Sequence, residues 1–212
     1  MAIIGAPMNL LALRRWLRRT GSLSAHLQTL GARFEVQRLS QGVAPLLPGE
    51  ARSLRLPAAT RCIVREVVLR VDGQPLVWAR SVAPAHALRG PWRSMGNLGS
   101  RPLAQLLFDT SSVSRSRLQP LRIGARGAWR AALGAGWQGA CGVPWPEAAA
   151  WGRYSVFRKA GAPLRVSEVF APAMRALPCP QTMRTASLGS PSTSASSRSP
   201  RTTAATPSGV PL

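Results

Sequence analysis

Charged side chains interrupt two stretches of this sequence in which every second residue is apolar. Arg65 stands among Ile, Val and Leu in RCIVREVVLRV (61–71), and Glu168 stands in the same way in LRVSEVFA (164–171). Because side chains alternate between the faces of a strand, each charged group should share a face with apolar neighbours. An inward guanidinium can bind a carboxylate, and an inward carboxyl group can move a proton. The two residues are therefore candidates for binding a small acid and acting on it.

A third charged residue, Arg80, lies in the second strand of a predicted hairpin. An Asp-Gly pair (72–73) separates the alternating runs 61–71 and 74–82, which is the strongest short hairpin signal. Simple pairing across this turn sets Arg80 directly opposite Arg65 on the apolar face. Like charges so placed repel each other and favour an anion bound between them. The alternative is a register shifted by one residue, in which both arginines face water.

Glu168 also admits two interpretations. Acidic side chains are rarely buried unless they are paired or functional. One interpretation is a structural ion pair with Arg65, and the other is a catalytic role. The sequence leaves its protonation state open. His26 and His86 are isolated, and we interpret both as surface or capping residues.

The elements that must position these residues are strands and a few short helices. Helical spacing of Leu and Trp marks the N-terminal part, and Ser22 is a good N-cap. Pro75 predicts an irregular start to the second hairpin strand. The expected helices are 8–19, 23–30 and 102–108, and the expected strands are 34–39, 61–71, 74–82, 154–158 and 164–171. Short links between strands favour an α+β fold, an antiparallel sheet with helices packed on one face.

Length and composition predict one domain followed by a tail. The chain has 212 residues, 45% of them hydrophobic, which is enough for a core. We expect the domain to cover residues 1–178, with an irregular segment at 44–58. The Gly-, Ala- and Trp-rich segment 127–149 is interpreted as an insertion or loop. Residues 179–212 are Ser, Thr, Pro, Ala and Arg with little to bury, and we predict that they are disordered.

The charge balance leaves one alternative function open. There are 28 Lys+Arg and 7 Asp+Glu residues, a net charge of +21. A basic nucleic-acid-binding protein is one interpretation, but the arginines form no long block, and scattered arginines need bind nothing. Three widely spaced cysteines indicate neither a zinc site nor a disulfide framework, which favours the cytoplasm. No apolar run is long enough for a membrane span.

Several stretches in a fixed order carry a resemblance to a known family. They are GSLSAHLQTLG (21–31), LLPGEA (46–51), VREVVLRVDGQPLVWARSVAP (64–84), LGSRPLAQLLFDTSSVSRS (98–116) and WGRYSVFRKAGAPLRVSEVFAPA (151–173). Together they resemble the bacterial chorismate pyruvate-lyases. The resemblance implies a six-stranded antiparallel sheet flanked by helices, with a ligand cavity closed off from solvent.

The resemblance also implies an activity and its residues. It implies a lyase that converts chorismate into 4-hydroxybenzoate and pyruvate, the first step towards ubiquinone, without metal or cofactor. Arg65 matches the family's carboxylate-binding arginine and Glu168 its acidic residue near the ring hydroxyl. Main-chain contacts to the ligand match Leu103 and Leu23. Arg80 as a partner for the second carboxylate is an inference from alternation alone.

The implied setting is a cytoplasmic protein, which we expect to be a monomer. Its expected partner is the small molecule chorismate, with no membrane or nucleic-acid partner. The alternative within the same fold is a domain that binds a small ligand without catalysis, because effector domains of some bacterial transcription regulators resemble it and fold alone does not fix function.

Overall fold

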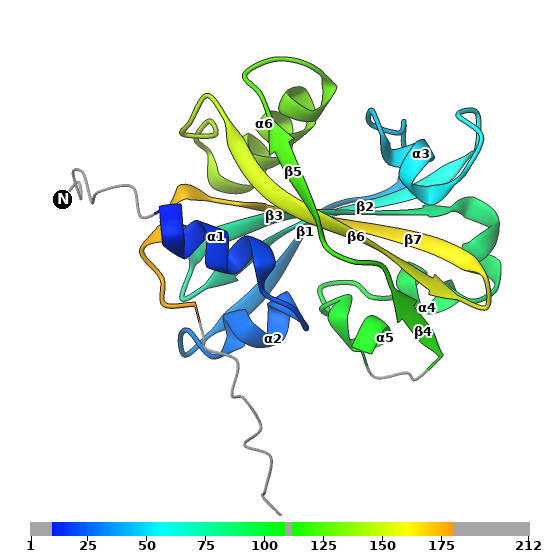
Figure 1. The fold of residues 1–212 in the computed structure, drawn as a ribbon, viewed down its shortest axis with the longest axis horizontal. Coiled ribbons are helices and arrows are strands. Elements are labelled where there is room, and N and C mark those ends of the chain that lie inside the picture. Colours follow the sequence, from blue (N-terminus) through cyan, green and yellow to red (C-terminus); the bar gives the residue numbers. More distant parts are fainter. Residues whose placement is uncertain (1–9, 109–111, 180–212) are drawn as a thin grey trace, which may run out of the picture. The chain divides into compact units, whose positions relative to one another are not determined.

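The computed structural model describes residues 10–108 and 112–179, shown as a coloured ribbon in Figure 1. The helices are α1 (Leu10–Arg18), α2 (Leu23–Gln28), α3 (Glu50–Leu54), α4 (Arg93–Gly96), α5 (Ala104–Phe108) and α6 (Ala128–Cys141), with 3-10 turns η1 (Ala85–Arg89) and η2 (Pro172–Arg175). The strands are β1 (Phe34–Val43), β2 (Cys62–Val71), β3 (Gln74–Pro84), β4 (Val113–Arg115), β5 (Gln119–Ile123), β6 (Ala150–Lys159) and β7 (Ala162–Phe170). Apart from Cys179, the tail predicted over 179–212 lies outside the described residues.

The strands of the described residues form one antiparallel sheet in the order β1-β2-β3-β7-β6-β4, with β5 also pairing with β6. The sheet therefore has seven strands, and the six-stranded expectation is wrong. The sixth position is divided, because β4 pairs with the end of β6 and β5 with its beginning. At the break, the Ser116 amide donates to the Val156 carbonyl and the Val156 amide donates to Ser116 Oγ.

Both predicted hairpins are confirmed, one joining β2 to β3 and the other joining β6 to β7. At the first turn Asp72 and Gly73 have φ of 48° and 79°, and at the second Ala160 and Gly161 have 44° and 78°. Positive φ at both central residues matches the twist of the flanking strands, so the turns hold the strands in a tight pair. The predicted N-cap is also confirmed, since Ser22 accepts a hydrogen bond from the Ala25 amide.

A β-bulge near the first turn shifts the register of β2 and β3 by one residue. Leu69 pairs with Val77 and Arg70 with Pro75, which leaves Leu76 as the extra residue. Proline has no N–H to donate to a ladder, and a bulge is one place where a strand accommodates it. The irregular start predicted from Pro75 is therefore confirmed, and every later residue of β3 pairs one position away from a simple ladder.

This shift separates the two arginines that alternation had set opposite each other. Arg65 pairs with Ser81, and Arg80 pairs with Glu66. The predicted opposition of Arg65 and Arg80 is wrong, because the bulge turns Arg80 to the other face of the sheet. The water-facing alternative is wrong as well, since Arg65 and Arg80 are only 2% and 3% exposed.

Helices cover both faces of the sheet rather than one (Figure 1). Residues of α1 and α2 pack with one face, and η1, α4 and α5 extend that layer. Residues of α3 and α6 pack with the other face. Helix α3 lies within the segment that we expected to be irregular. The prediction of helices on a single face is therefore wrong.

Helix α6 also overturns the loop interpretation of 127–149. It runs over 14 residues, and Leu133 and Trp137 are buried against Trp78 of β3 and its neighbours. One of the glycines that suggested a loop instead allows close packing. A Cβ on Gly136 would lie 2.6 Å from Trp78 Nε1, so the helix approaches the sheet only because that side chain is absent.

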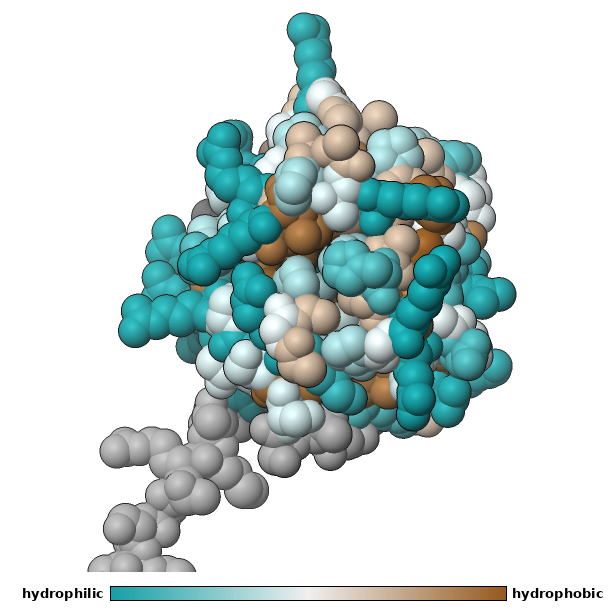
Figure 2. All heavy atoms as spheres, turned by 90° about the vertical axis from the view of Figure 1, so that its right-hand side faces the viewer, coloured by the Kyte–Doolittle hydropathy of each residue, from teal (hydrophilic) through white to brown (hydrophobic). Residues whose placement is uncertain are grey.

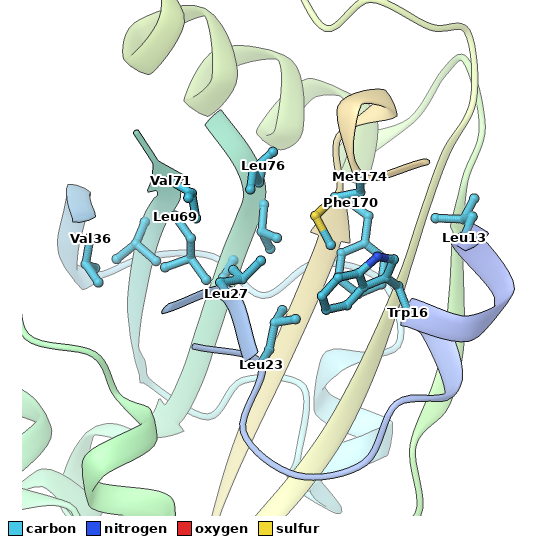
Figure 3. Packing of buried hydrophobic residues seen from close by; sticks show 13 residues of the cluster. Leu13, Trp16, Leu23, Leu27, Val36, Leu69, Val71, Leu76, Phe170 and Met174 are labelled. Atoms are coloured by element: carbon cyan, nitrogen blue, oxygen red, sulfur yellow. The ribbon is translucent and has the colours of Figure 1, made fainter. Parts of the chain in front are cut away.

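The N-terminal helices close one end of the first face. Trp16 of α1 and Leu27 of α2 are fully buried and point towards Leu69, Phe170 and Met174 (Figure 3). Burial of each such side chain contributes about 1.5–3 kcal/mol to folding. This cluster fixes α1 and α2 over the sheet, next to the polar residues described below.

The surface on one side is largely covered by hydrophilic side chains, with hydrophobic residues recessed between them (Figure 2). Part of the positive charge is nevertheless internal, because Arg65, Arg80, Arg153 and Arg165 are all at most 3% exposed. Within the described ranges no helix is both long and apolar enough to cross a membrane.

Candidate active site

Two rows of inward-facing residues cross β2, β3, β7 and β6 on the face covered by α2 and α5. Strand register aligns Arg65, Ser81, Val166 and Ser155 in one row and Val67, Ala79, Glu168 and Arg153 in the next. Polar groups from strands far apart in the sequence are thus brought side by side on an otherwise apolar floor.

A pocket lies above this floor. Its roof comes from Gly21, Leu23 and Ser24 at the start of α2 and from residues 102–104, 107 and 108 in and before α5. It contains about 560 Å³ of space free of protein atoms, its mouth included. Small-molecule sites commonly have mostly apolar walls and a few well-placed polar groups. This pocket has that character.

Arg65 stands at one end of the pocket without a counterion. Its Nη2 donates to the carbonyls of Gly99 and Arg101, at 3.0 and 3.2 Å, and its Nε is buried without a partner. Within the described part of the chain it makes no ion pair. Burial lowers the pKa of the Arg65 guanidinium, and the charge of Arg38 lowers that pKa further. A buried, uncompensated cation in a pocket is a site for an anion.

Glu168 lies further along the floor and is held by Arg153. Arg153 Nε is 2.6 Å from Glu168 Oε2, and the two side chains are 1% and 15% exposed. The partner expected for a structural ion pair was Arg65, and that part of the expectation is wrong. Register explains the difference, because Arg153 pairs directly with Glu168 across β6 and β7.

Arg153 also fixes the end of α1. Its Nη1 donates to the carbonyls of Trp16, at 2.9 Å, and of Arg19. Its guanidinium lies 5.5 Å from the centre of the Phe170 ring. These contacts leave little freedom to the guanidinium, so the carboxylate of Glu168 is anchored from the side away from Arg65.

Arg115 of β4 is a third charged group in the pocket wall. Its Nε donates to Ser155 Oγ and its Nη1 to the Gly21 carbonyl, both at 2.9 Å. Its guanidinium lies beside the rings of Phe108 and Phe157, at 5.5 and 5.1 Å from their centres, and the two rings contact each other edge to face. The side chain is therefore held in one orientation at the edge of the sheet.

Leu23 and Leu103, the main-chain candidates, both line the pocket. Leu23 is the first residue of α2, and Leu103 directly precedes α5. Amides at the first turn of a helix have no acceptor within the helix, so both positions suit a ligand oxygen. Leu103 lies close along the chain to the carbonyls that hold Arg65.

Arg80 does not line the pocket. On the opposite face its Nε is 2.9 Å from Glu50 Oε1 and its Nη1 is 2.6 Å from Glu66 Oε1, while Nη2 donates to the Pro45 carbonyl. Glu50 is completely buried. Of the five residues predicted for the site, four therefore meet in one pocket, and Arg80 belongs to a separate ionic cluster.

Two charged residues of the pocket region, Arg115 and Arg153, were missed. We predicted a strand that begins at Tyr154, whereas the corresponding strand, β6, begins at Ala150. An earlier start would have set Arg153 among Trp151, Ser155 and Phe157 on one face, the same signal that marked Glu168. Arg115 lies in a strand of three residues, too short for alternation to be visible.

The fold is that of an α+β protein, and its pocket has the chemical character of a site for a small organic anion. A sequence model of the family described as "Chorismate lyase" matches residues 7–175. The chain therefore belongs to the chorismate lyase family.

Individual relatives agree with that assignment. A "Probable chorismate pyruvate-lyase" of Albidiferax ferrireducens is 44% identical over 158 residues, which cover 74% of this chain and 80% of the relative. A protein of the same description from an Azoarcus species is 41% identical over 167 residues, 78% of this chain and 87% of the relative. Among solved structures, PhnF from Mycobacterium smegmatis shares 15% identity with a TM-score of 0.50. The likeness covers 72% of this chain and 64% of that one, just under two thirds, and shows the fold alone.

Proposed function

We propose that this protein converts chorismate into 4-hydroxybenzoate and pyruvate. The observation that carries the proposal is Arg65, a buried guanidinium without an acidic partner in the described residues, which faces a pocket that also contains Glu168. A pocket with an unpaired cation selects an anionic ligand, and apolar walls select a ring.

The proposed reaction needs one proton to move. Cleavage breaks the bond between a ring carbon and the ether oxygen of the enolpyruvyl group, and the bonding electrons leave with that oxygen. The adjacent ring carbon, which bears the hydroxyl, loses its proton, and the electrons of that C–H bond complete the aromatic ring. The methylene carbon of the departing group takes up a proton and becomes the methyl group of pyruvate. The proton count balances without any other reactant.

The pocket offers a group for each part of this reaction. Arg65, assisted by the Leu103 amide, binds the ring carboxylate through charge-assisted hydrogen bonds. Glu168, further along the floor, relays the proton from the ring to the departing group. The Leu23 amide contacts the same end of the ligand as Glu168.

Aromatisation supplies the driving force of the proposed reaction, so positioning and electrostatic stabilisation are what the protein must contribute. We place the reaction in the cytoplasm, at the first step towards ubiquinone, and propose that a monomer carries it out without metal or cofactor. Each chain has all the groups that the mechanism uses.

Chorismate turnover by three variants tests these roles. Glu168→Gln should lower kcat by about 10²–10⁴-fold, because it removes a proton carrier. Arg65→Met should lower kcat/KM by about tenfold or more, because it removes the charge-assisted contacts. Arg33→Met is the control, because Arg33 is exposed and directly precedes the edge strand β1, away from β7. This variant should behave as the wild type. Circular dichroism confirms that each variant is folded.

The outcomes separate the alternatives. Turnover by folded Glu168→Gln and Arg65→Met at wild-type rates contradicts the assigned roles. Tight binding of 4-hydroxybenzoate by a wild-type chain that leaves chorismate intact points instead to a domain that binds ligands without catalysis.

A further inference from the structure

Two guanidinium groups that line the pocket, those of Arg65 and Arg115, have no acidic partner within 4 Å among the described residues. Arg153, by contrast, is neutralised by Glu168. The proposed substrate is a dianion, whereas the groups assigned above engage only its ring carboxylate. The second carboxylate, on the enolpyruvyl group, still needs a partner.

We propose that Arg115 binds the enolpyruvyl carboxylate of the substrate. This inference rests on the proposed function and deepens it, because it assigns the residue that distinguishes the dianionic substrate from the monoanionic aromatic product. It replaces Arg80, which sequence alternation suggested for this role and which the β-bulge places on the other face.

The sheet places the two arginines at opposite sides of the pocket. Arg65 begins the row that passes through Ser81 and Val166 to Ser155, and Ser155 Oγ accepts a hydrogen bond from Arg115. Three strand spacings of about 4.8 Å put roughly 14 Å of sheet between the main chains of Arg65 and Ser155. Two long arginine side chains reaching inward from these sides can therefore contact the two ends of one small molecule.

Glu168 lies between Arg65 and Arg115 in the strand order of the sheet. Its strand, β7, pairs on one side with β3 and on the other with β6, and the charge of Glu168 acts on Arg115. A ligand whose ring carboxylate meets Arg65 and whose side-chain carboxylate meets Arg115 thus has its ether linkage near Glu168. That is the atom group at which the proposed reaction breaks a bond.

The local surroundings prepare Arg115 for an anion. Burial lowers the pKa of the Arg115 guanidinium, the charge of Glu168 raises it, and that of Arg153 lowers it. The side chain is more than a generic surface cation, because two hydrogen bonds and two aromatic rings fix its position. Little ordering is left to be done when a carboxylate arrives, which favours binding.

A comparison of substrate and product binding tests the inference. Arg115→Gln should lower kcat/KM for chorismate by at least about tenfold, the effect of losing a hydrogen bond between charged groups. The dissociation constant of 4-hydroxybenzoate, measured by calorimetry, should stay within about threefold, because this product lacks the second carboxylate. Arg115→Lys, which keeps the charge, should recover part of the loss.

A matched control uses a neighbour of the same charge. Arg117 is exposed two residues further along and does not line the pocket, so Arg117→Gln removes an equal charge without removing the contact. It should leave both quantities unchanged, and a loss of kcat/KM equal to that of Arg115→Gln would mean that net charge, not a contact, is responsible.

The possible results distinguish a failure of the inference about Arg115 from a failure of the proposed function. An active wild type with unchanged chorismate kinetics in Arg115→Gln overturns this inference alone. So does a variant that loses 4-hydroxybenzoate affinity in proportion to kcat/KM, since a structural role would affect both ligands. A wild type that does not turn over chorismate contradicts the proposed function, and the inference with it.

Discussion

Arg153 and Glu168 lie directly opposite each other on β6 and β7, joined by an ion pair of 2.6 Å. The same guanidinium donates to two main-chain carbonyls at the C-terminal end of α1. One buried side chain thus connects the first helix of the domain to the acidic residue of the pocket. The orientation of Glu168 consequently depends on both the sheet and the N-terminal helix.

A double-mutant cycle measures this connection. Arg153→Met should destabilise the protein by about 3–5 kcal/mol, because it leaves Glu168 without its ion-pair partner and removes hydrogen bonds to two main-chain carbonyls. The double variant Arg153→Met with Glu168→Gln should be more stable than the sum of the single effects by about 1–3 kcal/mol. Urea denaturation gives all four free energies of unfolding. Strictly additive effects would show that the pair contributes no interaction energy.

The packing of α6 predicts opposite effects for two glycines of one helix. Gly136→Ala should destabilise the protein by about 1–3 kcal/mol, because the new methyl group would overlap Trp78. Gly139→Ala meets no atom within 4 Å and should stabilise by up to about 1 kcal/mol through helix propensity. Thermal denaturation followed by circular dichroism distinguishes the two. A stabilising Gly136→Ala would mean that the helix does not lie against Trp78.

The ionic cluster on the other face predicts a large stability effect for Arg80. Arg80→Met leaves the completely buried Glu50 without its counterion and should cost about 3–5 kcal/mol. The exposed pair of Arg33 and Glu35 provides the control, since Arg33→Met should change stability by less than about 1 kcal/mol. Equal free energies of unfolding for the two variants, measured in urea, would contradict the buried position of the cluster.

The partly buried imidazole of His26 should make the protein less stable at mildly acidic pH. Burial lowers the pKa of its imidazole below the ordinary 6.5, and the charges of Arg19 and Arg153 lower it further, against an opposing effect of Glu168. The unfolded chain therefore takes up a proton at higher pH than the folded one. The stability linked to His26 is complete above pH 6.5 and declines as the pH falls through the lower, folded pKa.

Two histidine variants isolate that effect. His26→Gln should flatten the dependence of the melting temperature on pH between about 7.5 and 5.5, since glutamine does not titrate. His86→Gln, at an exposed position, should keep the wild-type slope. An unchanged slope in His26→Gln would assign the pH dependence to other groups.

Local patterns were enough to predict the two hairpins, the Ser22 cap and the inward position of Arg65 and Glu168. Each rests on short-range rules, namely turn chemistry, side-chain alternation and helix capping. The face of the sheet on which Arg80 lies was not predictable in the same way. Pro75 indicated an irregularity, but only the paired strand shows that Leu76 is the residue left out of the ladder.

Long-range packing accounts for the other differences. The Gly- and Ala-rich composition of 127–149 suggested a loop, whereas burial of Trp137 against the sheet stabilises a helix there. Glu50 gave no sign of burial, because its partner Arg80 lies 30 residues away. Arg153 escaped notice because the predicted strand began at Tyr154, four residues after the start of β6 and one residue after Arg153. Such contacts depend on which elements meet, and a single sequence does not encode that in any local pattern.

The most direct test of the account is the stoichiometry of chorismate consumption by the purified protein in the presence of a chelator. We predict equal amounts of 4-hydroxybenzoate and pyruvate, one of each per chorismate lost, at a rate that the chelator does not change. Chorismate that is bound and recovered intact, or consumed without release of both products, would contradict the assignment of this pocket as a lyase active site.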